Sequence, residues 1–277
     1  MSRPTTIIMH SHILRMLALL SIPAILISCS PDTQPTTIAE PEPNAPMQAA
    51  EQASASPVGE WGAYGADNGA TKYTNLDQID VGNVTELEVA WRRPALDAYY
   101  SAMNPSQRYT SNWISAPVVK NGIAYVPNGI GLVEAFDPGS GETIWVQEPH
   151  NGVDGLPGAN TRGVAYWSEG DDRRILVQRG TFLYALNADN GQPVPGFGTD
   201  GRVDLDLMPE GSELFRWGGV PTVVRDVVVI GQSMSDTFSD KEAFRGDVHA
   251  FDVRTGTLRW TYNTIPQEGQ FGTASWQ

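Results

Sequence analysis

The chain has 277 residues with 18 basic and 32 acidic side chains, a formal net charge of −14. This balance disfavours nucleic acid as a partner, because phosphate recognition requires a basic surface. The single cysteine, Cys29, excludes an internal disulfide. Only His150 and His249 follow the first thirty residues, and no cluster of His, Cys and carboxylates has zinc-ligand spacing, so a catalytic zinc is not expected.

Residues 1–29 have the pattern of a secretory signal. Arg3 and Arg15 precede an apolar run of roughly 12 residues, too short for a bilayer span, which needs about 20. Small Ser28 directly before Cys29 resembles a bacterial lipobox, which predicts a lipoprotein signal peptide with Cys29 as the lipidated residue. An ordinary signal peptide cut nearby, with Cys29 lost, is the alternative. Ser30, which is not the Asp of inner-membrane lipoproteins, favours the outer membrane.

Residues 30–57 are rich in Pro, Ala, Gln, Glu and Thr and have almost no aromatic or periodic apolar positions. This composition predicts a disordered tether. Globular sequence begins at about residue 58, so residues 58–277 are expected to form the folded domain, which is long enough to bury a core.

A pattern, Ala-x-Asp/Asn-x-x-x-Gly, occurs three times in this domain. Its anchors Asp137, Asn187 and Asp252 are 50 and 65 residues apart (187 − 137 and 252 − 187). A unit of this length is typical of a four-stranded propeller blade, and the fold class predicted is therefore an all-β propeller.

The repeat has a physical explanation as a β-hairpin. An apolar residue ends a strand, the Asp or Asn closes the turn through its side chain, and the Gly supplies a positive φ. In the first and third copies the next strand leads to Trp145 and Trp260, whereas the second copy has Pro195 at that place. We expect these indoles to stack between neighbouring sheets and to fix one blade against the next. The apolar residues before the anchors are Phe136, Leu186 and Phe251.

The repeats occur together with three further segments. The first is Trp61-Gly-Ala-Tyr-Gly-Ala-Asp67 with residues 73–79 and 83–91, which resemble an opening strand region; the others are Arg162-Gly-Val-Ala-Tyr-Trp167 and residues 246–260. In combination they resemble the quinoprotein dehydrogenases, eight-bladed propellers that carry pyrroloquinoline quinone on the propeller axis. The resemblance covers residues 61–276. It implies that this chain holds about three blades of the ring, and the lack of a closing turn signal before Gln277 predicts an N-terminal fragment.

Pyrroloquinoline quinone has three carboxylates and an ortho-quinone, which require cationic or hydroxyl donors and a hard divalent ion. The resemblance places Arg162 at a cofactor carboxylate and Asp236 on Ca²⁺ or Mg²⁺. A solvent-exposed loop arginine and a satisfied turn aspartate are the alternatives. Residues 223–230 are expected to form one buried strand leading into the loop that carries Asp236. The other cofactor contacts implied are Gly218, Ser233, Met234 and Ser235.

Two departures from the family pattern bear on activity. The family has a cofactor-binding Glu where this chain has Ile114, and its catalytic base comes from beyond the position of Gln277. We therefore expect no catalytic residue in this chain and no activity from the chain alone. Measurable dye reduction by the purified chain with quinone, Ca²⁺ and sugar would contradict that expectation.

The function implied is oxidation of a sugar or polyol hydroxyl by hydride transfer to pyrroloquinoline quinone. Absence of the vicinal cysteine pair of methanol-oxidising members favours this branch. Electrons would pass to a quinone or cytochrome of the respiratory chain, with the protein lipid-anchored to the outer membrane and facing the periplasm. The alternative is a non-enzymatic propeller lipoprotein that acts as a scaffold in outer-membrane assembly.

Overall fold

The computed structural model describes residues 59–96, 102, 115–149, 162–205, 216–217, 219–233 and 246–275. These residues all belong to one compact unit, Ala53–Gln277. The predicted signal peptide, Cys29 and the tether lie outside the described residues. Within the described ranges, no helix has the length and apolar character needed to span a bilayer; short 3₁₀ turns occur at Val84–Glu86 (η1) and Thr273–Ser275 (η2).

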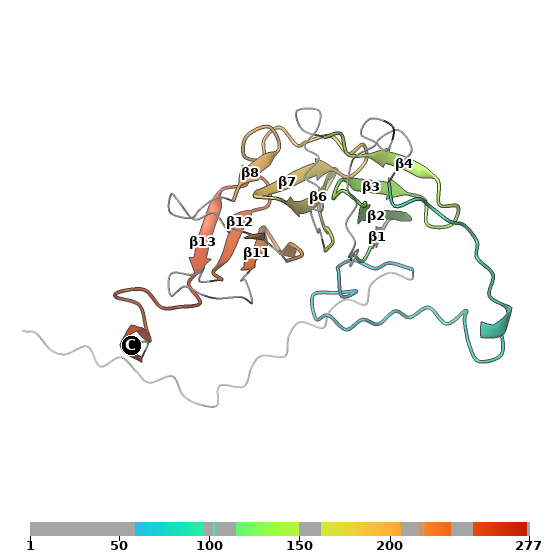
Figure 1. Ribbon diagram of the computed structural model, residues 1–277, viewed down its shortest axis with the longest axis horizontal. Helices are drawn as coiled ribbons and strands as arrows, with labels where there is room; N and C mark the ends of the chain where they lie inside the picture. Colours follow the sequence, from blue (N-terminus) through green and yellow to red (C-terminus); the bar gives the residue numbers. More distant parts are fainter. Residues whose placement is uncertain are drawn as a thin grey trace, which may run out of the picture. The chain divides into compact units, whose positions relative to one another are not determined.

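The folded part consists of three antiparallel sheets that follow one another along the chain, as Figure 1 shows in green, yellow and orange. In each sheet the strands pair in sequence order, which is the meander that the repeat predicts for a blade. Sheet 1 comprises β1 (Val118–Lys120), β2 (Ile123–Pro127), β3 (Val133–Phe136) and β4 (Thr143–Val146). Sheet 2 comprises β5 (Ala165–Glu169), β6 (Asp172–Arg179), β7 (Phe182–Asn187) and β8 (Arg202–Asp204). Sheet 3 comprises β10 (Thr222–Val224), β11 (Val227–Ser233), β12 (Val248–Asp252) and β13 (Leu258–Tyr262), with β9 (Arg216–Trp217) paired to the end of β11.

The turn after the third strand of each sheet has the geometry predicted from the repeat. In each copy the Gly N–H donates to the carbonyl of the anchor residue four positions earlier, at 2.8 Å. The anchor side chains also accept backbone hydrogen bonds: Asp137 Oδ1 from Gly139 and Ser140, both at 2.8 Å. These bonds keep the pKa of Asp137 below its usual value. The Asp/Asn anchor therefore closes the turn through its own side chain, as expected.

Sheets 1 and 2 are joined by Trp145, which is buried at 8% exposure. Its Nε1–H donates to the carbonyl of Ala188 at 3.0 Å, and its ring covers the repeat glycine Gly191. A Cβ added at Gly191 would lie 2.5 Å from Cε3 of Trp145. The predicted tryptophan stacking is confirmed here, because only glycine lets the indole approach the turn so closely.

The same docking occurs before sheet 1. Trp91 covers the repeat glycine Gly141, and its Nε1–H donates to the carbonyl of Pro138 at 3.0 Å. Nearby, Arg93 pairs with the buried carboxylate of Glu134 at 2.9 Å. The segment that carries Trp91 therefore packs on sheet 1 as β4 packs on sheet 2.

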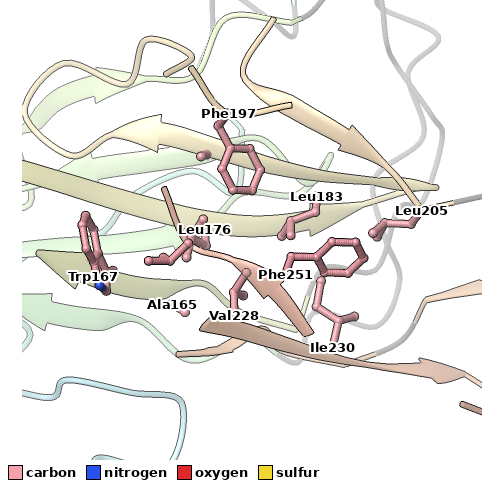
Figure 2. Packing of buried hydrophobic residues seen from close by; sticks show 11 residues of the cluster. Ala165, Trp167, Leu176, Leu183, Phe197, Leu205, Val228, Ile230 and Phe251 are labelled. Atoms are coloured by element: carbon pink, nitrogen blue, oxygen red, sulfur yellow. The ribbon is translucent and has the colours of Figure 1, made fainter. Parts of the chain in front are cut away.

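Sheets 2 and 3 are joined without a repeat tryptophan. Phe197, two residues after Pro195, is fully buried in the cluster between these sheets (Figure 2). A Cβ added at the repeat glycine Gly256 would lie 2.4 Å from Val203 and 3.4 Å from Phe197. Phe197 and Val203 together thus fill the place that the indole takes elsewhere. The cluster contains Ala165, Trp167, Leu176, Leu183, Ala185, Phe197, Leu205, Val228, Ile230, Phe251 and Val253.

A second contact between sheets 2 and 3 is centred on Trp167 of β5. Its Nε1–H donates to the carbonyl of Arg225 at 3.1 Å, and the guanidinium of Arg254 lies 5.1 Å from its ring centre. Arg254 also forms ion pairs with Glu169 at 2.8 Å and Asp226 at 3.1 Å. A hydrophobic cluster inside and charged contacts at the rim therefore hold these two sheets together.

Two local expectations were wrong. Residues 223–230 do not form one strand, because Arg225 adopts a φ of 53° and the chain turns there between β10 and β11. Residues 73–79 and 83–91 form no strand, and the described segment 59–96 forms only two isolated bridges, Trp61 with Val119 and Ala63 with Ala66. Residues 84–86 form the 3₁₀ turn η1 instead, and a strand also requires a neighbouring backbone as a hydrogen-bonding partner.

Candidate functional site

The first strands of the three sheets lie next to one another. Ala116, just before β1, forms a parallel bridge with Gly163, just before β5. A Cβ added at Gly163 would in turn lie 3.4 Å from the side chain of Val220, just before β10. The starts of β1, β5 and β10 thus lie close together. This is where a propeller builds an axial site.

A pocket of about 530 Å³ lies at this convergence. Its volume falls within the range of roughly 300–1,000 Å³ typical of small-molecule sites. Three segments line it: residues 62–70, which we name the inner loop, residues 162–166 at the start of β5, and residues 219–223 at the start of β10. The polar side chains in the lining are Tyr64, Asp67, Asn68, Arg162, Tyr166 and Thr222.

Arg162 is exposed and lies at the entrance to β5, in the lining of this pocket. It stands three residues before the first residue of β5, as Gly219 stands three residues before the first residue of β10. Gly219, at the corresponding position before sheet 3, has no side chain. The positive charge in the pocket lining therefore comes from Arg162. Arg162 is the arginine of the pocket lining, and its role at a cofactor carboxylate stays a prediction.

The inner loop is tied to the first strands on two sides. Trp61, just before it, exchanges backbone hydrogen bonds with Val119 of β1 at 2.8 and 3.1 Å. Asn68 Nδ2 donates to the carbonyl of Val223 in β10 at 3.3 Å. Within the loop, both carboxylate oxygens of Asp67 accept hydrogen bonds from Thr71, which hold the pKa of Asp67 below its usual value.

For the other predicted site residues, the structure describes no side chain. Gly218, Met234, Ser235 and Asp236 lie outside the described residues, as does Ile114. Ser233 ends β11, and only its backbone is described. Among the residues that the structure does describe, no group of three or more His, Cys, Asp and Glu side chains is arranged to hold a metal ion. The roles assigned to these residues stay predictions.

Sheet 3 carries a further polar group at the start of β12. Buried Asp247 accepts hydrogen bonds from Asn263 Nδ2 at 2.9 Å and from the backbone of Thr264 at 3.1 Å. His249 Nδ1 lies 2.9 Å from Thr261 Oγ1. Burial lowers the pKa of His249, and the nearby Asp247 charge opposes that shift. This group anchors the start of β12 to β13.

Sequence reasoning missed Tyr64 and Val220 as pocket residues. Tyr64 belongs to the segment Trp61–Asp67, which indicated the family but no role for the tyrosine. Val220 lies in an apolar run with no motif. A usable signal was Gly163, because a glycine beside Arg162 indicates that another group approaches the backbone closely. The structure shows that this group includes the ring of Tyr64, 3.3 Å from the place of a Cβ.

Comparison with known proteins gives the same architecture. Residues 61–277 match the family model described as "Glucose/ethanol/alcohol dehydrogenase, beta-propeller domain". The chain is 27% identical over 237 residues to the glycerol dehydrogenase large subunit of Gluconobacter oxydans, covering 80% of this chain and 31% of that protein. It is 28% identical over 248 residues to the quinoprotein glucose dehydrogenase of the same organism, covering 83% and 29%.

Among solved structures, the crystal structure of quinohemoprotein alcohol dehydrogenase from Comamonas testosteroni superposes with a TM-score of 0.57 at 26% identity, covering 76% of this chain and 28% of that one. The chain thus spans between a quarter and a third of the length of these relatives. The match includes the inner loop, Arg162 and all three sheets. The three sequential blades and the family match together show that the chain belongs to the family of pyrroloquinoline-quinone-dependent dehydrogenase propellers.

Proposed function

We propose that this chain forms the first blades of a quinoprotein oxidoreductase that oxidises a hydroxyl group of a sugar or polyol, and that the pocket beside Arg162 binds the quinone cofactor. The observation that carries the proposal is the family match over residues 61–277. Arg162 at the converging first strands supports it, because an axial pocket with a cation suits an anionic cofactor.

The described residues fit such a cofactor. The pocket volume of about 530 Å³ accommodates a small molecule, and Arg162 offers a planar guanidinium that matches a carboxylate. The lining before β10 includes Gly219, which has no side chain. Pyrroloquinoline quinone, when bound, supplies the electron-accepting ortho-quinone of the reaction.

The protein's own contribution is binding and orientation. Arg162 holds a cofactor carboxylate, and the hydroxyls of Ser233 and Ser235 and the backbone at Gly218 and Met234 supply further contacts. Asp236 binds a divalent ion, Ca²⁺ or Mg²⁺, which carboxylate oxygens suit. These assignments rest on the resemblance of the sequence to the family.

The cellular setting is also part of the proposal. Cys29 carries lipid and anchors the chain to the outer membrane on the periplasmic side, with residues 30–57 as the tether. A membrane quinone or a cytochrome accepts the electrons. The relatives' names, which include quinoprotein glucose and glycerol dehydrogenases, support small hydroxyl-bearing substrates. The matched family favours this enzyme function over a non-enzymatic scaffold.

The test is cofactor binding by the full 277-residue chain. Equilibrium dialysis with pyrroloquinoline quinone in the presence of Ca²⁺ measures Kd for the wild type, for Arg162→Ala and for the control Arg92→Ala, an exposed arginine outside the pocket. We expect Arg162→Ala to raise Kd by about tenfold to a hundredfold, because a hydrogen bond to a charged group contributes roughly 1.5–3 kcal/mol. Arg92→Ala should bind as the wild type does.

Two results would overturn the proposal. Wild-type chain that shows no saturable binding at millimolar quinone contradicts the cofactor site as a whole. Binding that is unchanged in Arg162→Ala contradicts the placement of the cofactor in this pocket. Thermal unfolding of each variant verifies that the substitution has left the fold intact.

A further inference from the structure

The tip of the inner loop lies beside the arginine of the pocket. We infer that Tyr64 is a contact residue for the molecule bound in this pocket, with its ring forming a flat wall and Arg162 providing the charge. The inference rests on the proposed function, because it takes the quinone cofactor as the occupant. It assigns a binding role to a residue for which the sequence predicted none.

The position of the ring follows from Gly163. A Cβ added at Gly163 would lie 3.3 Å from Cδ2 of Tyr64, so the ring packs against the residue next to Arg162. Gly163 itself is buried, whereas 42% of Tyr64 remains exposed and Tyr64 lines the pocket. The tyrosine thus packs at one ring edge against β5 and has much of its remaining surface open.

The loop that carries Tyr64 is fixed in an uncommon conformation. Ala66, Ala70 and Lys72 have φ values of 80°, 51° and 52°, and they are three of the six non-glycine residues with positive φ in the described ranges. Such conformations persist only where the surroundings enforce them, and they cluster at binding sites. The loop is held by an N–H of Lys72 that donates to the carbonyl of Gly65 at 2.9 Å.

The charges around the pocket favour a flat anion. Both oxygens of Asp67 are already engaged by Thr71, at 3.1 Å to its N–H and 2.8 Å to its hydroxyl. Among the described residues of the lining, none forms a hydrogen bond or ion pair with Arg162. Aromatic faces contact planar ring systems favourably. A planar ring that bears carboxylates combines both contacts, one with the ring of Tyr64 and one with the guanidinium of Arg162.

The experiment measures the Kd of pyrroloquinoline quinone by equilibrium dialysis for four forms of the full chain: wild type, Tyr64→Ala, Tyr64→Phe and Tyr262→Ala. Tyr262, on β13, is exposed at 65% and lies outside the pocket, so it controls for loss of a surface tyrosine. We expect Tyr64→Ala to raise Kd about threefold to tenfold, the range of one aromatic contact. Tyr64→Phe should stay within about twofold of the wild type, because the ring face is retained.

A second pair of variants separates binding from loop architecture. Gly163→Ala places a methyl group against Tyr64 and should raise Kd in the wild-type background. In the Tyr64→Ala background the same substitution should have a smaller effect, because no ring is left to displace. Equal effects in both backgrounds would show that Gly163 acts without Tyr64.

The failures are distinguishable. If the wild type binds the quinone and Tyr64→Ala binds equally well, the role of Tyr64 is wrong and the proposed function stands. If the wild type does not bind, the proposed function fails and the inference falls with it. If Tyr64→Ala unfolds at the assay temperature, Gly163→Ala decides: a Kd equal to that of the wild type contradicts the inference.

Discussion

The repeat places a tryptophan at the same position in two surroundings, between sheets 1 and 2 and on the outer face of sheet 3. Trp145 on β4 is exposed at 8%, whereas Trp260 on β13 is exposed at 45%. All five residues of β13 are exposed, and no described sheet covers them. The difference shows that the repeat tryptophan is buried where a glycine turn of a neighbouring sheet receives it, as Gly191 receives Trp145.

The joint between sheets 2 and 3 is an intermediate case. It has no repeat tryptophan, yet Gly256 is covered as closely as Gly191, by Val203 and Phe197 instead of an indole. The requirement of the joint is therefore a large apolar surface against a glycine turn, and the side chain that supplies it differs from one sheet to the next.

The largest expected effect tests the two tryptophans directly. Trp145→Ala should lower the free energy of unfolding by about 4 kcal/mol, because it removes a buried indole and leaves a cavity. Trp260→Ala should cost less than about 1 kcal/mol, since nearly half of that side chain is already in solvent. Urea unfolding monitored by circular dichroism measures both. Equal losses for the two variants would show that burial does not explain the comparison.

The next effect tests the receiving glycine. Gly191→Ala should cost about 3 kcal/mol, because φ is 72° and the new Cβ meets the ring of Trp145 at 2.5 Å. The control is Gly122→Ala, at a φ of 75° but with no atom within 4 Å, for which strain alone costs about 1 kcal/mol. In the Trp145→Ala background, Gly191→Ala should fall to the cost of the control. Unchanged cost in that background would contradict a steric contact between the two residues.

The smallest effect compares the anchors of the first and third turns by pH. Burial by itself raises the pKa of Asp252, but hydrogen bonds from Arg259, Thr255 and Arg254 bring it to about 2, below the usual 3.8. Because the pKa of Asp252 is lower in the folded state, its carboxylate adds about 2 kcal/mol to the free energy of unfolding. This contribution is present in full above pH 3.8 and is lost as the pH falls toward 2. Asp252→Asn should remove this part of the acid dependence of urea unfolding. Asp137→Asn, at the exposed anchor, should change it less, and the reverse order would refute the assignment.

The hairpin at each repeat was predictable because its causes are local. Asp137 closes its turn with its own side chain and Gly141 takes a positive φ of 76°, so the five residues from Asp137 to Gly141 determine the turn by themselves. The turn at Arg225 was missed because the valines on both sides of it favour one continuous strand, although the charged pair Arg225-Asp226 interrupts them and was the available signal. Phe197 was missed as well, since its role depends on a glycine 59 residues later in the chain (256 − 197).

For the candidate site, the sequence indicated Arg162 through its motif but did not indicate Tyr64. Arg162 belongs to a contiguous string of residues, whereas Tyr64 reaches the pocket only because its loop bonds to β1 and β10. The roles of Gly218 and of residues 233–236 stay predictions, because the side chains concerned lie outside the described part of the chain.

The sequence by itself determined the blade units, because strand alternation and turn chemistry act over a few residues. Tertiary structure decided which apolar side chain fills each joint and which residues meet at the first strands. These contacts join segments far apart in the chain, such as Tyr64 with Gly163, and Asn68 with Val223, which are 155 residues apart. Trp145 and Trp260 have the same local sequence signal, and only the presence of a packed neighbour makes one of them a core residue.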